Sequence, residues 1–193
     1  MPDTTTPEPP GDRVARCALS IAAALVHAST KDRAETRRMS DAGSAFFWRM
    51  VARLGIAPKD EPRWLVYTRM AAMLTPSTAT ASFHDTTRPL GAVLADGGDR
   101  HAHLDKPVVS EARLARLLAA RGDARLSALE RSLRGVARET RALDAASLAW
   151  AVLNPNGQQI ARAYYRRLDG GPSHIATSVE AAETSKVEYR TFP

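Results

Sequence analysis

The sequence has a single cysteine, Cys17, and no long hydrophobic run. A lone cysteine cannot form an internal disulfide, and it excludes zinc modules that need several cysteines, so the expected compartment is a reducing one. No apolar run, that of residues 21–26 included, exceeds six residues, whereas a transmembrane helix needs about 20. The acidic, proline-rich start does not resemble a signal peptide. We therefore expect a cytoplasmic protein with no membrane partner.

Residues that favour β-strands are also scarce. Val and Ile together number 15, against 53 for Ala and Leu. Because β-branched residues favour strands whereas Ala and Leu favour helices, this composition predicts an all-α fold. With 193 residues, of which 44% are hydrophobic, the chain can bury a core without disulfides. We expect a compact helical bundle, built as two small helical lobes.

Hydrophobic periodicity gives the organisation of the chain. Apolar residues recur at helical spacing in segments separated by turn residues, and the longest of these segments is 124–142. Both ends of the chain lack such periodicity, which is typical of flexible tails. The expected parts are a flexible N-terminal tail (1–12), an N-terminal lobe (13–98), a linker loop (99–109), a C-terminal lobe (110–169) and a flexible C-terminal tail (170–193).

Signatures of catalysis are absent or weak. The sequence contains no GxGxxG, no glycine-rich phosphate loop before a lysine, no HExxH and no GxSxG. His101 and His103 lie between Asp99 and Asp105 but lack a further ligand at helical spacing, which argues against a metal site. Cys17 falls on an apolar helix face, where we expect a buried, inert thiol. We expect no enzyme, no cofactor, no metal and no small-molecule substrate.

The charge of the chain is carried mostly by arginine. There are 23 arginines and four lysines against 21 acids, which gives a net charge of +6. An arginine excess can reflect phosphate recognition or the base composition of the genome. Residues 31–69 carry +4 and residues 110–169 carry +5, whereas each of the other three segments carries −1. This concentration favours a binding surface over a general bias.

The segment 124–142 carries the clearest pattern. Its Leu and Val stripe lies on one face, and a row of arginines lies about 140° away from it. Glu130 can pair with Arg134, whereas Glu139 lies off the row. The row can be a solvated polar face, but an arginine row of this kind favours phosphate binding. The row consists of Arg131, Arg134, Arg138 and Arg141.

Two further arginine pairs lie on the outer faces of other predicted helices, Arg113 with Arg116 and Arg37 with Arg38. Pairs on adjacent helices allow a protein to follow a nucleic-acid backbone without reading its bases. Most of the aromatic residues fall at positions of the predicted helices that must form the core. We therefore expect no exposed set of aromatic rings on which bases stack. The candidate nucleic-acid-binding residues are Arg37, Arg38, Arg113, Arg116, Arg131, Arg134 and Arg138.

Four stretches between residues 30 and 168 resemble a known family. Their order and spacing are similar to those of the CasB family, the small subunit of the type I-E CRISPR surveillance complex Cascade. The stretches are KDRAETRRMSDAG with FFWRMVARLG, then RWLVYTRMAAMLT, then PLGAVLADGG with SEARLARLLAARGD, and last LSALERSLRGVARE with DAASLAWAVLN and ARAYYRRL.

The resemblance implies an all-helical, non-catalytic subunit, present as two copies beside the repeated backbone subunits and the large subunit of Cascade. It also implies that basic residues hold crRNA-paired target DNA and the displaced strand. The family's basic positions match Arg37, Arg38, Arg113, Arg116 and Arg131, whereas Arg134 and Arg138 come only from the arginine row.

The chain departs from the family pattern at several positions. Ala92 stands where an arginine is usual, and Ala145 follows Asp144 where a tryptophan is usual. Two other hypotheses remain open. One is a free-standing helical RNA- or DNA-binding protein, and the other is a helical scaffold subunit whose arginine face pairs with an acidic protein.

Overall fold

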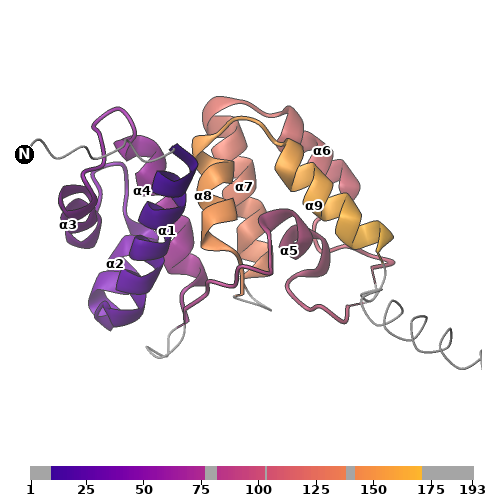
Figure 1. Ribbon diagram of the computed structural model, residues 1–193, viewed down its shortest axis with the longest axis horizontal. Helices are drawn as coiled ribbons and strands as arrows, with labels where there is room; N and C mark the ends of the chain where they lie inside the picture. The colour runs from indigo at the N-terminus through magenta and orange to yellow at the C-terminus, as the bar shows by residue number, and fades with distance from the viewer. Residues whose placement is uncertain (1–9, 77–81, 103, 138–141, 171–193) are drawn as a thin grey trace, which may run out of the picture.

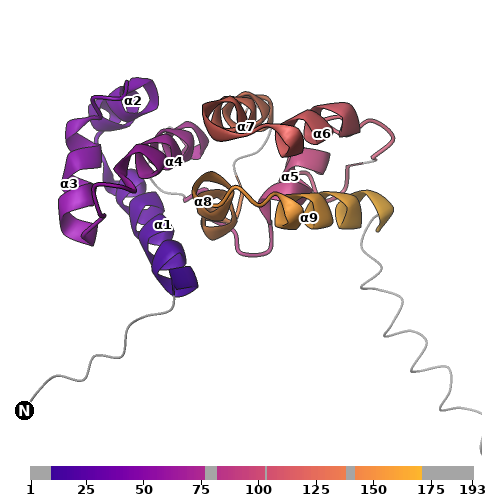
Figure 2. The same cartoon turned by 90° about the horizontal axis from the view of Figure 1, so that it is seen from above.

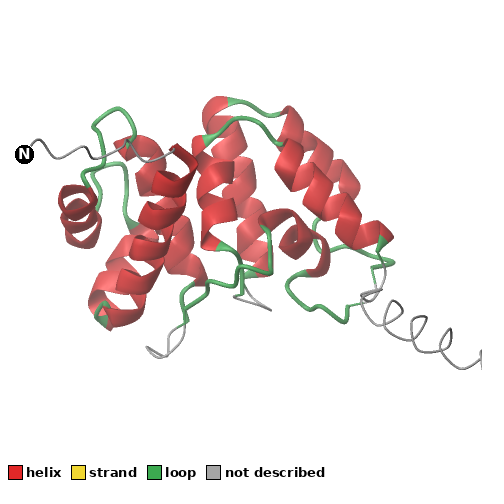
Figure 3. Ribbon diagram, viewed as in Figure 1, coloured by secondary structure: helices red, strands yellow, loops and turns green. Residues whose placement is uncertain are grey.

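The computed structural model describes residues 10–76, 82–102, 104–137 and 142–170. Within these ranges the chain forms nine α-helices and no β-strand (Figure 3). The predicted all-α fold is confirmed. The helices are α1 (Pro10–His27), α2 (Thr30–Arg38), α3 (Ala45–Leu54), α4 (Glu61–Leu74), α5 (Leu90–Asp96), α6 (Glu111–Ala119), α7 (Gly122–Val136), α8 (Ala145–Leu153) and α9 (Gln158–Asp169).

Capping residues explain several of the helix ends. Ser29 and Ser44 precede α2 and α3, and each hydroxyl accepts a hydrogen bond from a backbone N–H in the first turn. Asp144 caps α8 in the same way, with its carboxylate accepting from two N–H groups. After α3 and α5 the chain turns through Gly55 and Gly97, which adopt the left-handed conformation that favours glycine.

The bounds of α1 and α7 differ from the predicted ones. α1 begins at Pro10, three residues before the predicted start, because proline fits the first turn of a helix. α7 has Ala137 as its C-cap, whereas the periodicity predicts a helix as far as residue 142. Arg138 and Arg141 lie outside the described residues, as does nearly all of the predicted C-terminal tail.

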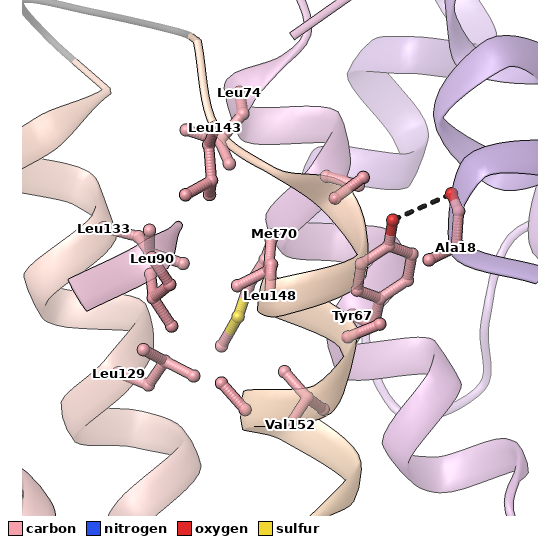
Figure 4. Packing of buried hydrophobic residues seen from close by; sticks show 14 of the residues in the cluster. Ala18, Tyr67, Met70, Leu74, Leu90, Leu129, Leu133, Leu143, Leu148 and Val152 are labelled. Atoms are coloured by element: carbon pink, nitrogen blue, oxygen red, sulfur yellow. Dashed lines mark hydrogen bonds between the residues drawn. The ribbon is translucent and has the colours of Figure 1, made fainter. Parts of the chain in front are cut away.

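The helices of the N-terminal part, α1 to α4, lie at one end of the molecule, and α5 to α9 lie at the other (Figure 1). The two groups share a continuous core, because α8 packs against both α1 and α4, and α4 also contacts α7. Figure 4 shows the centre of this core, where Met70 of α4 lies among Leu129 and Leu133 of α7 and Leu148 and Val152 of α8.

The short helix α5 makes its most extensive helix contact with α9. A Cβ atom at Gly91 would lie 2.1 Å from the Ile160 carbonyl oxygen, so only glycine allows the two helices to approach this closely. The sequence places α5 in the 13–98 lobe, but in the structure it packs with the C-terminal helices. The reason is this contact between segments about 70 residues apart, for which the local pattern gives no signal.

Cys17 is expected to be buried, and its side chain, on α1, lies in the hydrophobic core. Within the described ranges, every helix is too short or too polar to serve as a membrane span.

Candidate nucleic-acid interface

Helices α6 and α7 lie side by side along one edge of the molecule, with α8 and α9 toward the opposite edge (Figure 2). A groove of about 410 Å³ lies between α6 and α7. Three of the predicted arginines line it, two from α6 and one from α7, and none of the described lining residues is acidic. The lining residues are Val108, Val109, Arg113, Arg116, Leu117, Ala128, Arg131, Ser132 and Gly135.

The segment just before α6 forms one wall of the groove. Hydrogen bonds to α5 and α9 hold this segment in place. The backbone N–H groups of Val108 and Val109 donate to the carbonyls of Ala95 and Leu94 at the end of α5. The Tyr164 hydroxyl on α9 donates to the Val109 carbonyl at 2.6 Å. Leu114 and Leu117 of α6 are buried beneath the arginines. The groove is therefore built on a fixed backbone.

The three groove arginines are exposed and available for a ligand. Among the described residues, Arg113 and Arg131 have no hydrogen bond or ion pair. The Nε of Arg116 donates to the carbonyl of Ala112 in its own helix at 3.2 Å, which leaves its two terminal amino groups without a described partner. Three guanidinium groups around one groove match the chemistry of phosphate recognition.

Arg134 lies one turn from Arg131 and is exposed, but it is paired. Its Nη2 lies 2.7 Å from Oε1 of Glu130, as the i,i+4 spacing predicts. Glu130 is itself nearly buried and also binds Arg69 of α4. One carboxylate is therefore shared by two arginines, and the group of three retains a net charge of +1.

The arginines at the end of α2 have different surroundings. Arg37 is half-buried, and its Nε and Nη2 donate to the carbonyls of Ala72 and Thr75, so this side chain ties α2 to the end of α4. Arg38 is exposed. It precedes Met39, whose carbonyl accepts a hydrogen bond from Arg69, so the end of α2 is linked through α4 to Glu130 of α7.

The structure thus brings Arg113, Arg116 and Arg131 together and places Arg134 beside them. Arg38 lies apart, Arg37 serves the contact between α2 and α4, and Arg138 lies outside the described residues.

Two arginines that the sequence analysis does not single out are important in the structure. Arg125 is 3% exposed and Arg69 binds Glu130. Arg125 lies four residues before Leu129, so helical spacing could have placed it on the buried face of α7. The contact of Arg69 spans 61 residues of sequence and has no local signal.

The predicted absence of a metal site concerns His101 and His103, and His103 lies outside the described residues. In the described part of the chain, no group of three His, Cys, Asp or Glu side chains is placed to hold a metal ion. Comparison with protein-family models, with curated proteins and with solved structures finds no match to this chain.

Proposed function

We propose that this protein binds the sugar–phosphate backbone of nucleic acid in the α6/α7 groove. The observation that carries the proposal is the meeting of Arg113, Arg116 and Arg131 around a groove whose lining, in the part of the chain that the structure describes, includes no acidic residue. Guanidinium groups bind phosphate oxygens through paired, charge-assisted hydrogen bonds, which are stronger than neutral ones. The net charge of +6 favours the approach of a polyanion.

The composition of the groove favours contact with phosphates over contact with bases. Its other lining residues are aliphatic or small, apart from Ser132, whose hydroxyl donates to the Ala128 carbonyl. The described aromatic side chains that are exposed, Trp48 and Tyr165, lie on α3 and α9 and do not line the groove. Without aromatic rings for stacking, binding depends little on base sequence.

The resemblance to the CasB family supports a more specific role for the same groove. In this role the protein is a non-catalytic small subunit of a type I-E Cascade complex. Two copies lie beside the backbone and large subunits, and the groove stabilises the R-loop formed by crRNA and target DNA in antiviral defence. Arg134, one turn after Arg131, extends the basic surface beside the groove.

The test is a triple charge reversal, Arg113→Glu with Arg116→Glu and Arg131→Glu, measured by target-DNA binding of the assembled complex. The matched control is Arg53→Glu with Arg162→Glu and Arg166→Glu, which makes the same charge change at exposed positions of α3 and α9. Three phosphate contacts on a duplex give a slope of log affinity against log salt of about −2.7. We expect the groove variant to lose affinity and to flatten this slope by about that amount, and the control to change far less.

The same experiment separates the other hypotheses. Loss of DNA binding by the isolated groove variant, with no effect of the protein on Cascade assembly, would favour a free-standing nucleic-acid-binding protein. If both variants assembled and bound DNA as the original chain does, the groove would be a solvated surface. Capture of an acidic protein through the groove, with no nucleic-acid binding, would favour the scaffold.

A further inference from the structure

A second cavity lies on the other side of α7, against α4 and the turn after α8. Its volume is about 550 Å³, within the range of about 300 to 1,000 Å³ that is typical of small-molecule sites. It shares no lining residue with the α6/α7 groove. Its charged lining residues are Lys59, Arg63, Arg69 and Arg125, with the acids Asp41, Asp123 and Glu130.

Arg125 is the unusual member of this set. Its Nη1 donates to the carbonyls of Ala151 at 2.6 Å and Asn154 at 3.2 Å, at the end of α8. Its Nε and Nη2 are buried and have no hydrogen-bond partner in the described part of the chain. Leaving such a donor unsatisfied costs about 1 to 3 kcal/mol, and more for a charged group.

A further donor in the same cavity is also unsatisfied. Four buried side-chain nitrogens lack a partner among the described residues, and three of them belong to arginines that line this cavity. These are Nε of Arg69 and Nε and Nη2 of Arg125, and the fourth is Nε of Arg88, which does not line the cavity.

The acids of the cavity do not neutralise Arg125. Glu130 is occupied by Arg69 and Arg134. Asp41 and Asp123 have no ion pair with the described cations. Burial lowers the pKa of Arg125, and the nearby charges of Arg121 and Arg63 lower it further. The cavity therefore has four cationic and three acidic lining residues, and none of the three carboxylates pairs with Arg125.

The backbone N–H groups of the first turn of α7 add partial positive charge, which the Asp123 carboxylate in the same turn offsets in part. Gly122 and Asp123 line the cavity, and the N-cap residue Arg121 makes no side-chain capping hydrogen bond to this turn. The N–H groups at the start of a helix have no partner within the helix and favour an anion.

We propose that this cavity is a second anion site, which takes a phosphate group between Lys59, Arg63 and Arg125. Lys59 and Arg63 are exposed and meet the anion first, and a rotation of the Arg125 side chain then presents its Nη2 to the phosphate oxygens. The phosphate can belong to a nucleic-acid backbone or to a free polyphosphate. The proposal does not depend on the function assigned to the α6/α7 groove.

The test is a titration of the ¹⁵N-labelled full chain with inorganic pyrophosphate, followed through the arginine Nε–H signals in NMR spectra. We expect saturable shifts of the Arg125 and Arg69 signals. Arg88 is an internal control, because its Nε is also buried and unsatisfied but lies outside the cavity. Equal shifts of all three signals, or no saturation, would overturn the proposal.

Variants at the rim test the same site without disturbing the buried arginine. Lys59→Gln and Arg63→Gln should each weaken pyrophosphate binding about tenfold, the effect of one charge-assisted hydrogen bond. The matched controls are Lys106→Gln and Arg53→Gln, at exposed positions that do not line the cavity. If Arg113→Gln or Arg131→Gln weakened pyrophosphate binding and the rim variants did not, the anion would belong to the α6/α7 groove. That result would overturn the proposal.

The source of the phosphate is determined by competition. If an eight-nucleotide oligothymidylate displaces pyrophosphate and shifts the same Arg125 signal, the site takes a nucleic-acid phosphate. If pyrophosphate alone shifts it, the ligand is a free polyphosphate. Both results support the anion site, whereas an Arg125 signal that responds to neither would overturn it.

Discussion

Arg69 and Glu130 form an ion pair that joins α4 to α7, with 2.9 Å between Nη2 and Oε2. The side chains are 22% and 12% exposed, so water screens the pair only in part. Glu130 also binds Arg134 at 2.7 Å, and Arg69 also donates to the Met39 carbonyl. This pair fixes the position of α7 relative to α4, and with it the position of Arg131 in the groove.

Replacing Glu130 with glutamine should destabilise the protein by about 2 to 4 kcal/mol, because it leaves the partly buried Arg69 without its carboxylate. The measurement is urea unfolding followed by circular dichroism. The control is Glu35→Gln, which breaks an exposed ion pair of 3.9 Å with Lys31 and should cost less than about 1 kcal/mol. Equal losses in the two variants would mean that the pair between α4 and α7 is not a stabilising contact.

Asp96 should be more sensitive still. Its side chain is fully buried and accepts from Arg88 at 2.6 Å and from Arg167 at 2.7 Å, which ties α5 to α9. Asp96→Asn would leave two buried guanidinium groups without a negative partner, at a cost of about 3 to 5 kcal/mol. The control is Asp85→Asn, which breaks a more exposed pair with Arg100. A melting temperature of Asp96→Asn equal to that of the control would contradict this reasoning.

The arginines divide into those that the sequence identifies and those that it does not. Arg113, Arg116 and Arg131 are identified because an exposed helix face follows from spacing alone, and α6 and α7 are neighbours in the chain. Arg37 has the same local signal as Arg38, yet it binds carbonyls of α4 that lie 35 and 38 residues away. Contacts between distant segments decide which arginines face solvent, and they depend on how the helices pack.

The same distinction holds for the fold. Helix positions follow from apolar periodicity and capping residues, which are local, and the predicted all-α fold is the observed one. The packing of α5 on α9 depends on the absence of a side chain at Gly91 opposite Ile160. A glycine inside a short helix has several possible causes, and only the assembled structure identifies its packing partner.

Tyr164 gives a prediction of pH dependence. Burial, together with the smaller effect of the nearby charge of Glu111, raises the pKa of Tyr164 to about 12. Because the unfolded pKa is about 10, the protonated hydroxyl stabilises the folded state fully below pH 10, and this contribution is lost as the pH rises toward 12. Tyr164→Phe also removes the hydrogen bond to the Val109 carbonyl, which should cost about 1 to 2 kcal/mol at pH 8.

The stability difference between the original chain and Tyr164→Phe should therefore narrow by about 1.4 kcal/mol between pH 8 and pH 11. Urea unfolding at the two pH values measures it. A difference that stays constant would mean that the tyrosine hydroxyl ionises equally in the folded and unfolded states.

Gly135 allows the stability of α7 and binding in the α6/α7 groove to be tested at one position. It lies in α7, has no positive φ, and a Cβ atom placed there would meet nothing within 4 Å. Gly135→Ala should stabilise the protein by about 0.5 to 1 kcal/mol, because alanine loses less backbone entropy in a helix. The melting temperature should rise by about 1 to 4 °C.

Gly135→Glu places a carboxylate in the groove, four residues after Arg131. Glutamate is also a good helix former, so this variant should be about as stable as Gly135→Ala. Its carboxylate pairs with Arg131 and repels phosphate, so nucleic-acid affinity should fall about tenfold and the salt slope should become shallower by about one contact, or about 0.9. The measurement is a titration of nucleic acid at several salt concentrations for both variants. Equal affinities of Gly135→Glu and Gly135→Ala, at equal stability, would place nucleic-acid binding elsewhere on the molecule.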